Sequence, residues 1–343
     1  MIDKNMSIDS ISPVFITGVY RSGTTLFSRI LDVHPRFAVT YDSLHYMRFC
    51  YGEFRPLSDP ANRRALIEDI TERCQSRWMR RLDPAPVLAE LDAMENPGDA
   101  EIYDCVMRHY LSGSERKAEW GEKTLMAWAR IPDFLKMFPK GKTVVVLRDP
   151  RDACASQKKI TYEPGLRYLD TGFAALHAMQ AAFDFEHSLP PASYATVKYE
   201  DLVDDPESVL RGLCTRLEIE FDPAMLDARN FRDYSGGPWL ANTSYEDDAP
   251  VAIGSKSVGR YKEALDPVDV QFLEMICRPM LAYWKYDLDG ELPTPEQWQR
   301  LYAIMNDSFI AGRMRHWMAT GQGVDVYPSA PPRILRDEPE DAA

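Results

Sequence analysis

The stretch that most constrains the fold of this chain is PVFITGVYRSGTTLFSRILDVHP, residues 13–35. Residues 13–18 form a short apolar run of the kind that becomes a buried strand. Residues 24–35 carry apolar side chains at helical spacing, and a proline follows the last of them. The sequence therefore predicts a strand, a loop bounded by two glycines, and a helix whose N-terminal backbone N–H groups attract an anion.

The spacing of this loop is close to that of a phosphate-binding loop, which reads Gly, any four residues, Gly, Lys, then Ser or Thr. Gly18, Gly23 and Thr25 occupy the matching positions, but Thr24 replaces the lysine. Because that lysine is the main cation for γ-phosphate transfer, the loop argues against a P-loop nucleotide kinase. Arg21 remains as the cation that can grip an anion. Taken alone, the stretch leaves a chance glycine match open.

Further strands and helices alternate along the chain. Residues 37–41 and 193–202 contain candidate strands, and GKTVVVLRDP (141–150) contains a run that is apolar on both faces, as in a central parallel strand. Helical patterns follow these runs, among them residues 205–219 with Pro206 at the first helical position. This alternation predicts an α/β, P-loop-like three-layer fold with a mostly parallel central sheet flanked by helices.

The domain organisation is expected to be one α/β domain with an insertion. Residues 43–118 are helical by period and interrupt the α/β pattern, so the domain is predicted over residues 1–290 with a helical insertion at about 43–118. Residues 291–343 are predicted to be a C-terminal helix and an acidic, Pro-rich tail. One helix is expected over residues 294–318, with a core-packing apolar stripe of Trp298, Leu301, Met305 and Phe309.

Composition excludes several classes of protein. The 343 residues carry a formal net charge of -13, which disfavours nucleic acid and anionic membranes as partners. No apolar run is long enough for a transmembrane helix, and the N-terminus lacks the pattern of a signal peptide. Six widely spaced cysteines without a CxxC pair predict reduced thiols in a cytoplasmic protein and no metal site. The oligomeric state stays open, a homodimer included.

A second basic cluster follows the strand of residues 141–150. Arg148 and Arg151 lie at the end of that strand, and Ser156 is on the helix that follows. Arg148 and Ser156 are eight residues apart across the turn and could converge on a second phosphate. The alternative is a solvated Arg–Asp turn with no ligand. This alternative becomes less plausible when two basic clusters lie at strand ends of one sheet.

Together, these motifs resemble the sulfotransferases that use 3'-phosphoadenosine 5'-phosphosulfate (PAPS), and most closely the tyrosylprotein sulfotransferase type with its bacterial relatives. The resemblance rests on YRSGTTL (20–26), GEKT (121–124), LRDPRDACAS (147–156), VKYEDLVDDPESVL (197–210) and SKSVGRYKEAL (255–265). It implies that the 5'-phosphosulfate is held by Arg21, Ser22, Gly23, Thr24 and Thr25. It also implies that the 3'-phosphate is held by Arg148 and Ser156, with Tyr199 near the nucleotide and Ser257, Arg260 and Lys262 on a closing loop.

The resemblance further implies in-line sulfuryl transfer to a hydroxyl, with PAPS as co-substrate and no metal. Lys123 and Arg21 would stabilise the charge that develops on the departing nucleotide. The position of the family's catalytic glutamate corresponds to Asp42, which is one methylene shorter, and His45 is the rival general base. The alternative for Asp42 is a helix N-cap, and for His45 a packed polar residue.

The acceptor is expected to be a small or medium-sized, largely apolar alcohol or phenol, such as a bacterial metabolite or lipid. The resemblance leads one to expect arginines at two positions after the general base. Arg48 occupies one of them, and Leu44 occupies the other. The net charge would also repel an acidic peptide. Aromatic residues in the insertion could line an apolar pocket, although core packing is the commoner use: Tyr46, Phe49, Tyr51, Phe54 and Trp78. The alternatives are a tyrosine-peptide sulfotransferase and, outside this chemistry, a P-loop nucleotide kinase or a non-catalytic nucleotide-binding protein.

Overall fold

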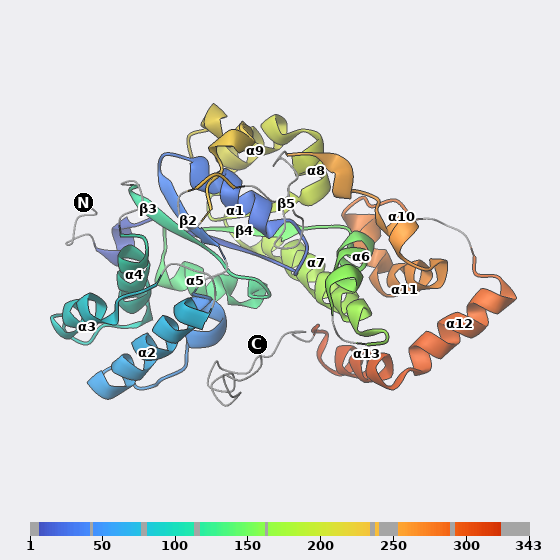
Figure 1. The fold of residues 1–343 in the computed structure, drawn as a ribbon, viewed down its shortest axis with the longest axis horizontal. Helices are drawn as coiled ribbons and strands as arrows, with labels where there is room; N and C mark the ends of the chain where they lie inside the picture. Colours follow the sequence, from blue (N-terminus) through green and yellow to red (C-terminus); the bar gives the residue numbers. More distant parts are fainter. Residues whose placement is uncertain are drawn as a thin grey trace.

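A five-stranded parallel sheet forms the centre of the part of the chain that the structure describes (Figure 1). The structure is a computed structural model, and it describes residues 7–41, 44–76, 81–112, 117–161, 164–233, 237–239, 253–288 and 292–323. The strand order is β2-β3-β1-β4-β5. The strands are β1 (Val14–Gly18), β2 (Phe37–Tyr41), β3 (Glu119–Lys123), β4 (Lys142–Leu147) and β5 (Tyr194–Lys198).

Helices cover both faces of this sheet and make a three-layer α/β fold, as the sequence predicts. Apolar side chains of α1, α8 and α9 pack on one face, and those of α4, α5 and α7 pack on the other. The α-helices up to α7 are α1 (Thr24–Val33), α2 (Pro60–Ser76), α3 (Pro84–Asp92), α4 (Asp99–Tyr110), α5 (Ile131–Met137), α6 (Pro150–Ile160) and α7 (Asp170–Ser188). The later ones are α8 (Tyr199–Asp204), α9 (Pro206–Arg216), α10 (Tyr261–Ala264), α11 (Pro267–Tyr283), α12 (Pro295–Asn306) and α13 (Ser308–Thr320).

Strand β3 is a central strand that the apolar pattern of the sequence does not reveal. It reads EWGEK, yet all five residues are buried and the strand lies between β2 and β1. Successive side chains of a strand point to opposite faces, so Glu122 and Lys123 lie on opposite sides of the sheet. Both are almost completely buried, Glu122 at 0% and Lys123 at 1% exposure.

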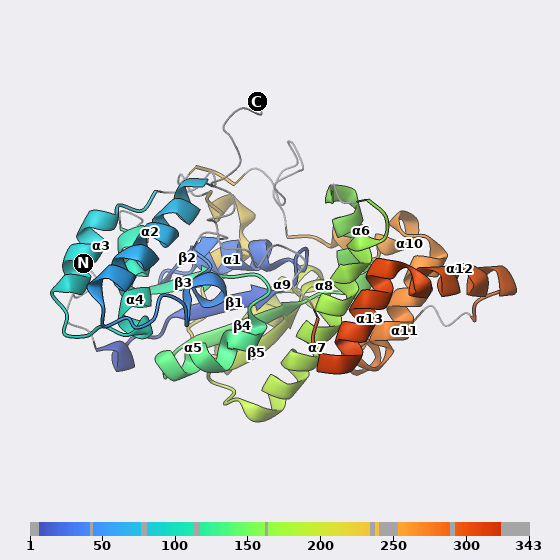
Figure 2. The same cartoon turned by 90° about the horizontal axis from the view of Figure 1, so that it is seen from below.

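The helical segment between β2 and β3 begins with a π-helix at Tyr46–Cys50 and continues through α2, α3 and α4. Figure 2 shows α2, α3 and α4 grouped at one end of the sheet, with α10 to α13 at the other end. The apolar residues of α2, α3 and α4 belong to the same core cluster as Phe15 and Val145 of the sheet. The segment therefore shares its core with the central sheet.

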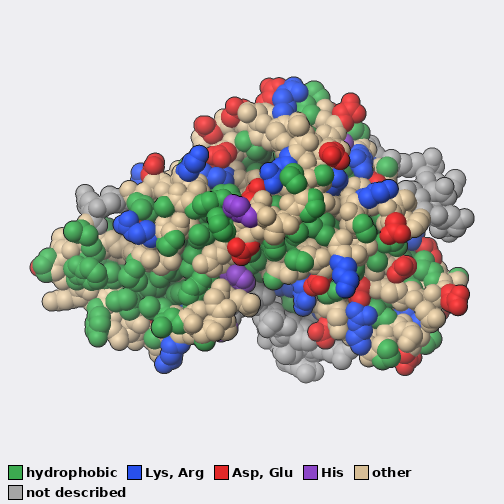
Figure 3. Space-filling model, turned by 180° about the vertical axis from the view of Figure 1, so that it is seen from behind, with side chains coloured by type: hydrophobic (Ala, Val, Ile, Leu, Met, Phe, Trp, Pro, Cys, Tyr) green, Lys and Arg blue, Asp and Glu red, His purple; other side chains and the backbone are tan. Residues whose placement is uncertain are grey.

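The C-terminal region differs from the single helix expected over residues 294–318. It forms two helices, α12 and α13, because the Asp307 side chain accepts hydrogen bonds from the N–H groups of Phe309 and Ile310 and starts a new helix. Leu301 is buried, as the predicted core-packing stripe requires, but Trp298 is 51% exposed. Figure 3 shows hydrophobic side chains gathered over the end of the molecule that α11 and α12 form.

The six cysteines are all buried and unpaired. Burial raises the pKa of each thiol, so each is protonated at neutral pH. Within the described residues, the longest apolar helical stretches fall short of what crossing a bilayer requires.

Candidate active site at the carboxyl edge of the sheet

The loop between β1 and α1 depends on two glycines that bring backbone and neighbouring side chains close together. Gly23 has a φ of 90° and is the N-cap of α1. A Cβ at Gly23 would lie 2.2 Å from Cδ2 of Tyr199, and one at Gly18 would lie 2.5 Å from the carbonyl oxygen of Val146. Both positions therefore require glycine, and the helix N-terminus that follows suits an anion.

Arg21 and Arg148 join the two basic clusters into one site. The Nε of Arg21 donates to Oγ of Ser156 at 2.9 Å, and Arg148 Nη1 donates to the carbonyl oxygen of Arg21 at 2.8 Å. The Arg148 guanidinium carbon also lies 4.7 Å from the ring centroid of Tyr199. Arg148 Nε is buried and has no hydrogen-bond partner among the described residues. A donor in that state fits a ligand that brings its own acceptors.

Arg151, which stands beside Arg148 in the sequence, has a different role. It is buried, and its guanidinium binds Asp149 at 2.8 Å and Glu274 at 2.5 Å. Two carboxylates satisfy this cation, so it joins the end of β4 to α11 and is not available to a ligand. Only Arg148 of the two remains a ligand-binding candidate.

Lys123 brings a cation from β3 to the start of α1. Its Nζ lies 3.5 Å from Oγ1 of Thr25, on the first turn of that helix. Ser22 and Thr24 are buried, and Ser22 Oγ donates to the carbonyl oxygen of Val19 at 2.8 Å. Lys123 therefore brings a positive charge next to a loop in which Thr24 stands at the lysine position of a phosphate-binding loop.

The segment of residues 253–265 lies against this site and is held there by Asp152, a buried residue of α6. The two oxygens of the Asp152 carboxylate accept from the backbone N–H groups of Gly259, at 2.7 Å, and Tyr261, at 2.9 Å. Arg148 Nη2 donates to the carbonyl oxygen of Ser257 at 2.5 Å. The side chains of the neighbouring cations Arg260 and Lys262 are exposed. Asp152 was not among the site residues expected from the sequence.

The connection after β2 carries the candidate general bases. Asp42 lies outside the described residues. Tyr41 pairs with Lys123 in the sheet, so the described residues that follow β2 start at the same edge as Lys123. His45 is 4% exposed, has a φ of 52°, and its backbone N–H donates to Oε1 of Glu122 at 2.6 Å.

Glu122 is a second residue that the sequence did not single out. Its carboxylate accepts from the Tyr103 hydroxyl on α4 as well as from His45. Burial raises the pKa of Glu122 to about 7, although the hydrogen bonds from Tyr103 and His45 act in the opposite direction. Its position in GEKT, directly before Lys123, was the only available signal.

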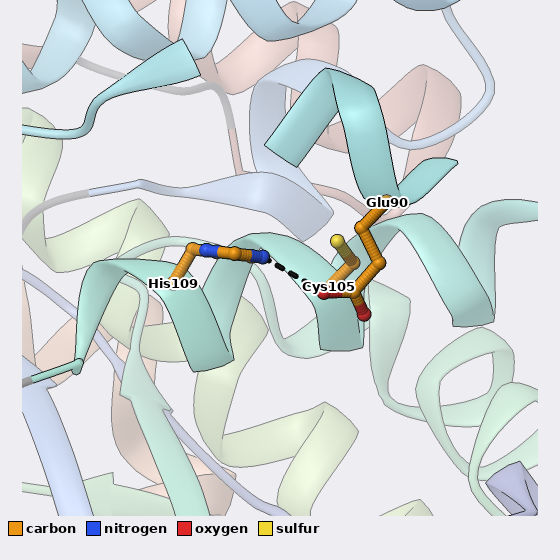
Figure 4. A group of neighbouring side chains, drawn as sticks. All are labelled: Glu90, Cys105 and His109. Carbon is orange, nitrogen blue, oxygen red and sulfur yellow. Dashed lines mark hydrogen bonds and ion pairs between the residues drawn. The ribbon is translucent and has the colours of Figure 1, made fainter. Parts of the chain in front are cut away.

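Glu90, Cys105 and His109 form the grouping within the described residues that comes nearest to a metal site (Figure 4). Glu90 reaches from α3 toward Cys105 and His109 on α4, and its Oε2 lies 2.9 Å from His109 Nε2. Its other oxygen lies 2.5 Å from the guanidinium of Arg108. Because both carboxylate oxygens are already paired and a fixed cation adjoins them, the group is an ion-pair network that joins α3 to α4.

The structure is a P-loop-like α/β fold whose glycine loop, Arg21, Lys123 and Arg148 gather at the carboxyl edge of the sheet. The model of the sulfotransferase family matches residues 13–223, which include the loop, Lys123, Arg148, Ser156 and Tyr199. The chain belongs to this family and is a PAPS-dependent sulfotransferase.

Known relatives support this assignment, and solved structures share the fold. Protein-tyrosine sulfotransferase 1 of Danio rerio is 28% identical over 297 residues, covering 82% of this chain and 74% of the relative. The Homo sapiens protein of the same name is 27% identical, covering 80% and 69%. The sulfotransferase domain of the Synechococcus PCC 7002 olefin synthase has a TM-score of 0.54 at 19% identity, covering 85% of this chain and 100% of that domain. The sulfotransferase domain from the curacin biosynthetic pathway has the same TM-score and identity, covering 81% and 99%.

Proposed function

We propose that the linked anion sites hold the two ends of PAPS. The loop residues would bind the 5'-phosphosulfate: Arg21, Ser22, Gly23, Thr24 and Thr25. Arg148 and Ser156 would bind the 3'-phosphate, Tyr199 would lie near the nucleotide, and Ser257, Arg260 and Lys262 would close over it. The observation that carries this proposal is the chain of contacts from Arg148 through Arg21 to Ser156, which joins both basic clusters. A donor with two separated phosphates needs such a double site.

The residues at this edge are suited to in-line transfer of a sulfuryl group. A bond forms between the acceptor oxygen and sulfur while the bond from sulfur to the bridging oxygen of the nucleotide breaks. Arg21 and Lys123 would stabilise the negative charge that develops on that bridging oxygen. These two cations are buried or half-buried, where they act more strongly than in water. The proposal gives the charge-stabilising role to them and requires no metal ion.

A general base must take the proton of the acceptor hydroxyl. We assign this role to Asp42, whose position in the sequence matches that of the glutamate in the resembling family. His45 is the alternative; it lies three residues further along the chain and is buried. Both belong to the short connection after β2.

We propose that the acceptor is a small or medium-sized, largely apolar alcohol or phenol. Arg48, the arginine that could recognise an acidic peptide, already donates to the Tyr20 hydroxyl at 2.8 Å and lies 4.8 Å from the ring centroid of Phe49. Partly buried aromatic residues, Phe49 and Tyr51, belong to the helical segment and could line an apolar acceptor site. Tyr46 is fully buried and stacks on Tyr103, so it belongs to the core. Trp78 lies outside the described residues.

A tyrosine in an acidic peptide is the second candidate acceptor. The names of the relatives from Danio rerio and Homo sapiens favour it. The net charge of -13 opposes it, because an acidic chain repels an acidic peptide at long range. The same charge disfavours nucleic acid as a partner, and the six unpaired, buried cysteines support a cytoplasmic location.

Competition between acceptors tests this proposal. The protein would be incubated with labelled PAPS and an equimolar mixture of 2-naphthol, a long-chain alcohol and an acidic tyrosine peptide, at low and at moderate salt. We expect the label to enter the phenol or the alcohol with little effect of salt. Efficient labelling of the peptide that disappears when salt is added would overturn the proposed acceptor and assign a peptide-modifying role.

A further inference from the structure

The buried carboxylate of Glu122 connects β3, α4 and the π-helix at Tyr46–Cys50. Glu122 lies on β3, and its oxygens accept from the Tyr103 hydroxyl of α4 and from the backbone N–H of His45 at 2.6 Å. The backbone N–H of Tyr46 also interacts with this carboxylate. His45 and Tyr46 are the N-cap and the first residue of the π-helix. Glu122 therefore caps, from a neighbouring strand, the helix that begins immediately after the base segment.

The position of Glu122 relative to Lys123 gives this contact a role in the reaction. Adjacent residues of β3 point to opposite faces of the sheet. Lys123 reaches the first turn of α1 at 3.5 Å from Thr25, whereas Glu122 reaches the helical segment on the other face. Two adjacent residues of β3 therefore act on different faces of the sheet. Lys123 brings the cation proposed to act on the sulfuryl donor, and Glu122 holds the backbone near the proposed general base.

We propose that Glu122 is a positioning residue for sulfuryl transfer: its ionised carboxylate holds the backbone at His45 and Tyr46, where the helical segment begins. This inference rests on the proposed function of this edge as the transfer site. Glu122 touches neither the acceptor nor the donor in this role. It acts through the segment that it holds, so its loss should lower turnover and spare nucleotide binding.

Burial raises the pKa of Glu122 to about 7, and His45, the rival base, is an ionisable residue whose backbone contacts it. Tyr103 of α4, Tyr46 and Cys50 of the π-helix and Cys74 of α2 are its titratable neighbours, and burial raises the pKa of all four. They stay neutral from pH 5 to 8. Asp99 and Arg55 pair with each other behind Tyr46, Arg73 pairs with Asp69 on α2, and Lys123 points to the opposite face. Protonation of Glu122 below about pH 7 should therefore weaken its hold on the two N–H groups.

The experiment compares Glu122→Gln with Glu119→Gln. Glu119 is a matched control on the same strand, since it is also buried and accepts from a backbone N–H, that of Ser12, but at the opposite end of the strand. With labelled PAPS and 2-naphthol as probes, we expect Glu122→Gln to lower kcat about 10- to 100-fold and to leave the KM for PAPS unchanged. Glu119→Gln should change neither constant. The wild-type rate should rise through about pH 7, and this rise should be absent from Glu122→Gln.

A second variant and a second measurement protect the test from a folding defect. Tyr103→Phe keeps the ring but removes a donor that favours the ionised carboxylate, so the rise in rate should move to higher pH. Hydrogen exchange at pH 7.5 should be faster for the N–H groups of residues 45 and 46 in Glu122→Gln, and unchanged in Glu119→Gln. An active wild type whose Glu122→Gln variant keeps its kcat and its pH profile would overturn the inference alone. A wild type that neither sulfates a probe nor is stabilised by adenosine 3',5'-bisphosphate would overturn the proposed function, and the catalytic role of Glu122 with it.

Discussion

Asp42 and His45 can be distinguished by a substitution that keeps shape and removes basicity. Asp42→Asn is nearly isosteric with the wild type but cannot accept the proton of the acceptor. We expect turnover to fall about 10²- to 10⁴-fold, the usual scale for loss of a general base, while binding of adenosine 3',5'-bisphosphate persists. Rate measurements together with a thermal-shift titration check this. Full activity of Asp42→Asn, combined with an inactive His45→Ala, would move the role to His45.

Gly23 and Gly52 both have a positive φ, 90° and 83°, but only Gly23 meets the ring of Tyr199. An alanine at Gly52 should cost about 1 kcal/mol in free energy of unfolding because of the left-handed backbone, and one at Gly23 should cost more because its Cβ would also collide with the Tyr199 ring. Only Gly23→Ala should also lose the stabilisation by adenosine 3',5'-bisphosphate, since its Cβ would push apart the loop and Tyr199. Denaturant unfolding with and without the nucleotide measures both effects. Equal nucleotide stabilisation of the two variants would contradict the cradle.

At the scale of elements, the sequence predicts the strands that lead into the two basic clusters better than it predicts β3. Strands β1 and β4 are predictable because apolar runs lead directly into the glycine loop and into Arg148. β3 has no such run, because buried Glu122 and Lys123 interrupt its apolar pattern. A polar residue in a central strand is stabilised by partners from other elements, and no local pattern contains them. The same reason hides Asp152, whose partners lie more than 100 residues away.

The C-terminal helices show the opposite case, a local signal that was present in the sequence. Asp307 stands between two helical patterns, and aspartate is among the preferred N-cap residues. An uninterrupted apolar period over residues 294–318 nevertheless indicates one helix. The split is decided by the Asp307 side chain, which binds two N–H groups of α13.

Asp152 joins α6 to the segment of residues 253–265, and its removal should loosen that whole segment. Asp152→Ala leaves the N–H groups of Gly259 and Tyr261 without their acceptor. We expect the Kd for adenosine 3',5'-bisphosphate to rise about tenfold, which corresponds to about 1.4 kcal/mol. Calorimetric titration measures the Kd, and hydrogen exchange should quicken over residues 255–262.

Asp266→Ala is the matched control for this prediction. Asp266 is also an acidic residue that accepts from a backbone N–H, that of Val268, at the start of α11. Unlike Asp152, it pairs with an exposed arginine, Arg300 of α12. Its removal should leave the Kd unchanged. A similar loss of affinity in both variants would show that the loss of either carboxylate weakens nucleotide binding. The contacts of Asp152 to Gly259 and Tyr261 would then have no special role.

At the scale of the whole molecule, an acidic protein must hold a strongly anionic donor against its own net charge of -13. Local cations make this feasible: Arg21, Lys123 and Arg148 are all contributed at the carboxyl edge of the sheet. Adenosine 3',5'-bisphosphate at 100 times its Kd should add about 2.7 kcal/mol to the free energy of unfolding. ATP with magnesium should add far less, because Thr24 replaces the lysine that a triphosphate requires. Thermal unfolding compares the two, and stabilisation by ATP alone would contradict the assigned ligand.

Because all six thiols are buried, the rate at which each is alkylated reports local unfolding around it. An alkylating reagent reacts with the thiolate, so each cysteine can be modified only while its surroundings are transiently unfolded. Cys154 on α6 and Cys74 on α2 sample two regions that a nucleotide should stabilise unequally. Ligand binding at the edge of β1 and β4 should slow the labelling of Cys154 more than that of Cys74. The labelling rates of individual cysteines would then show which regions of the protein the bound nucleotide stabilises.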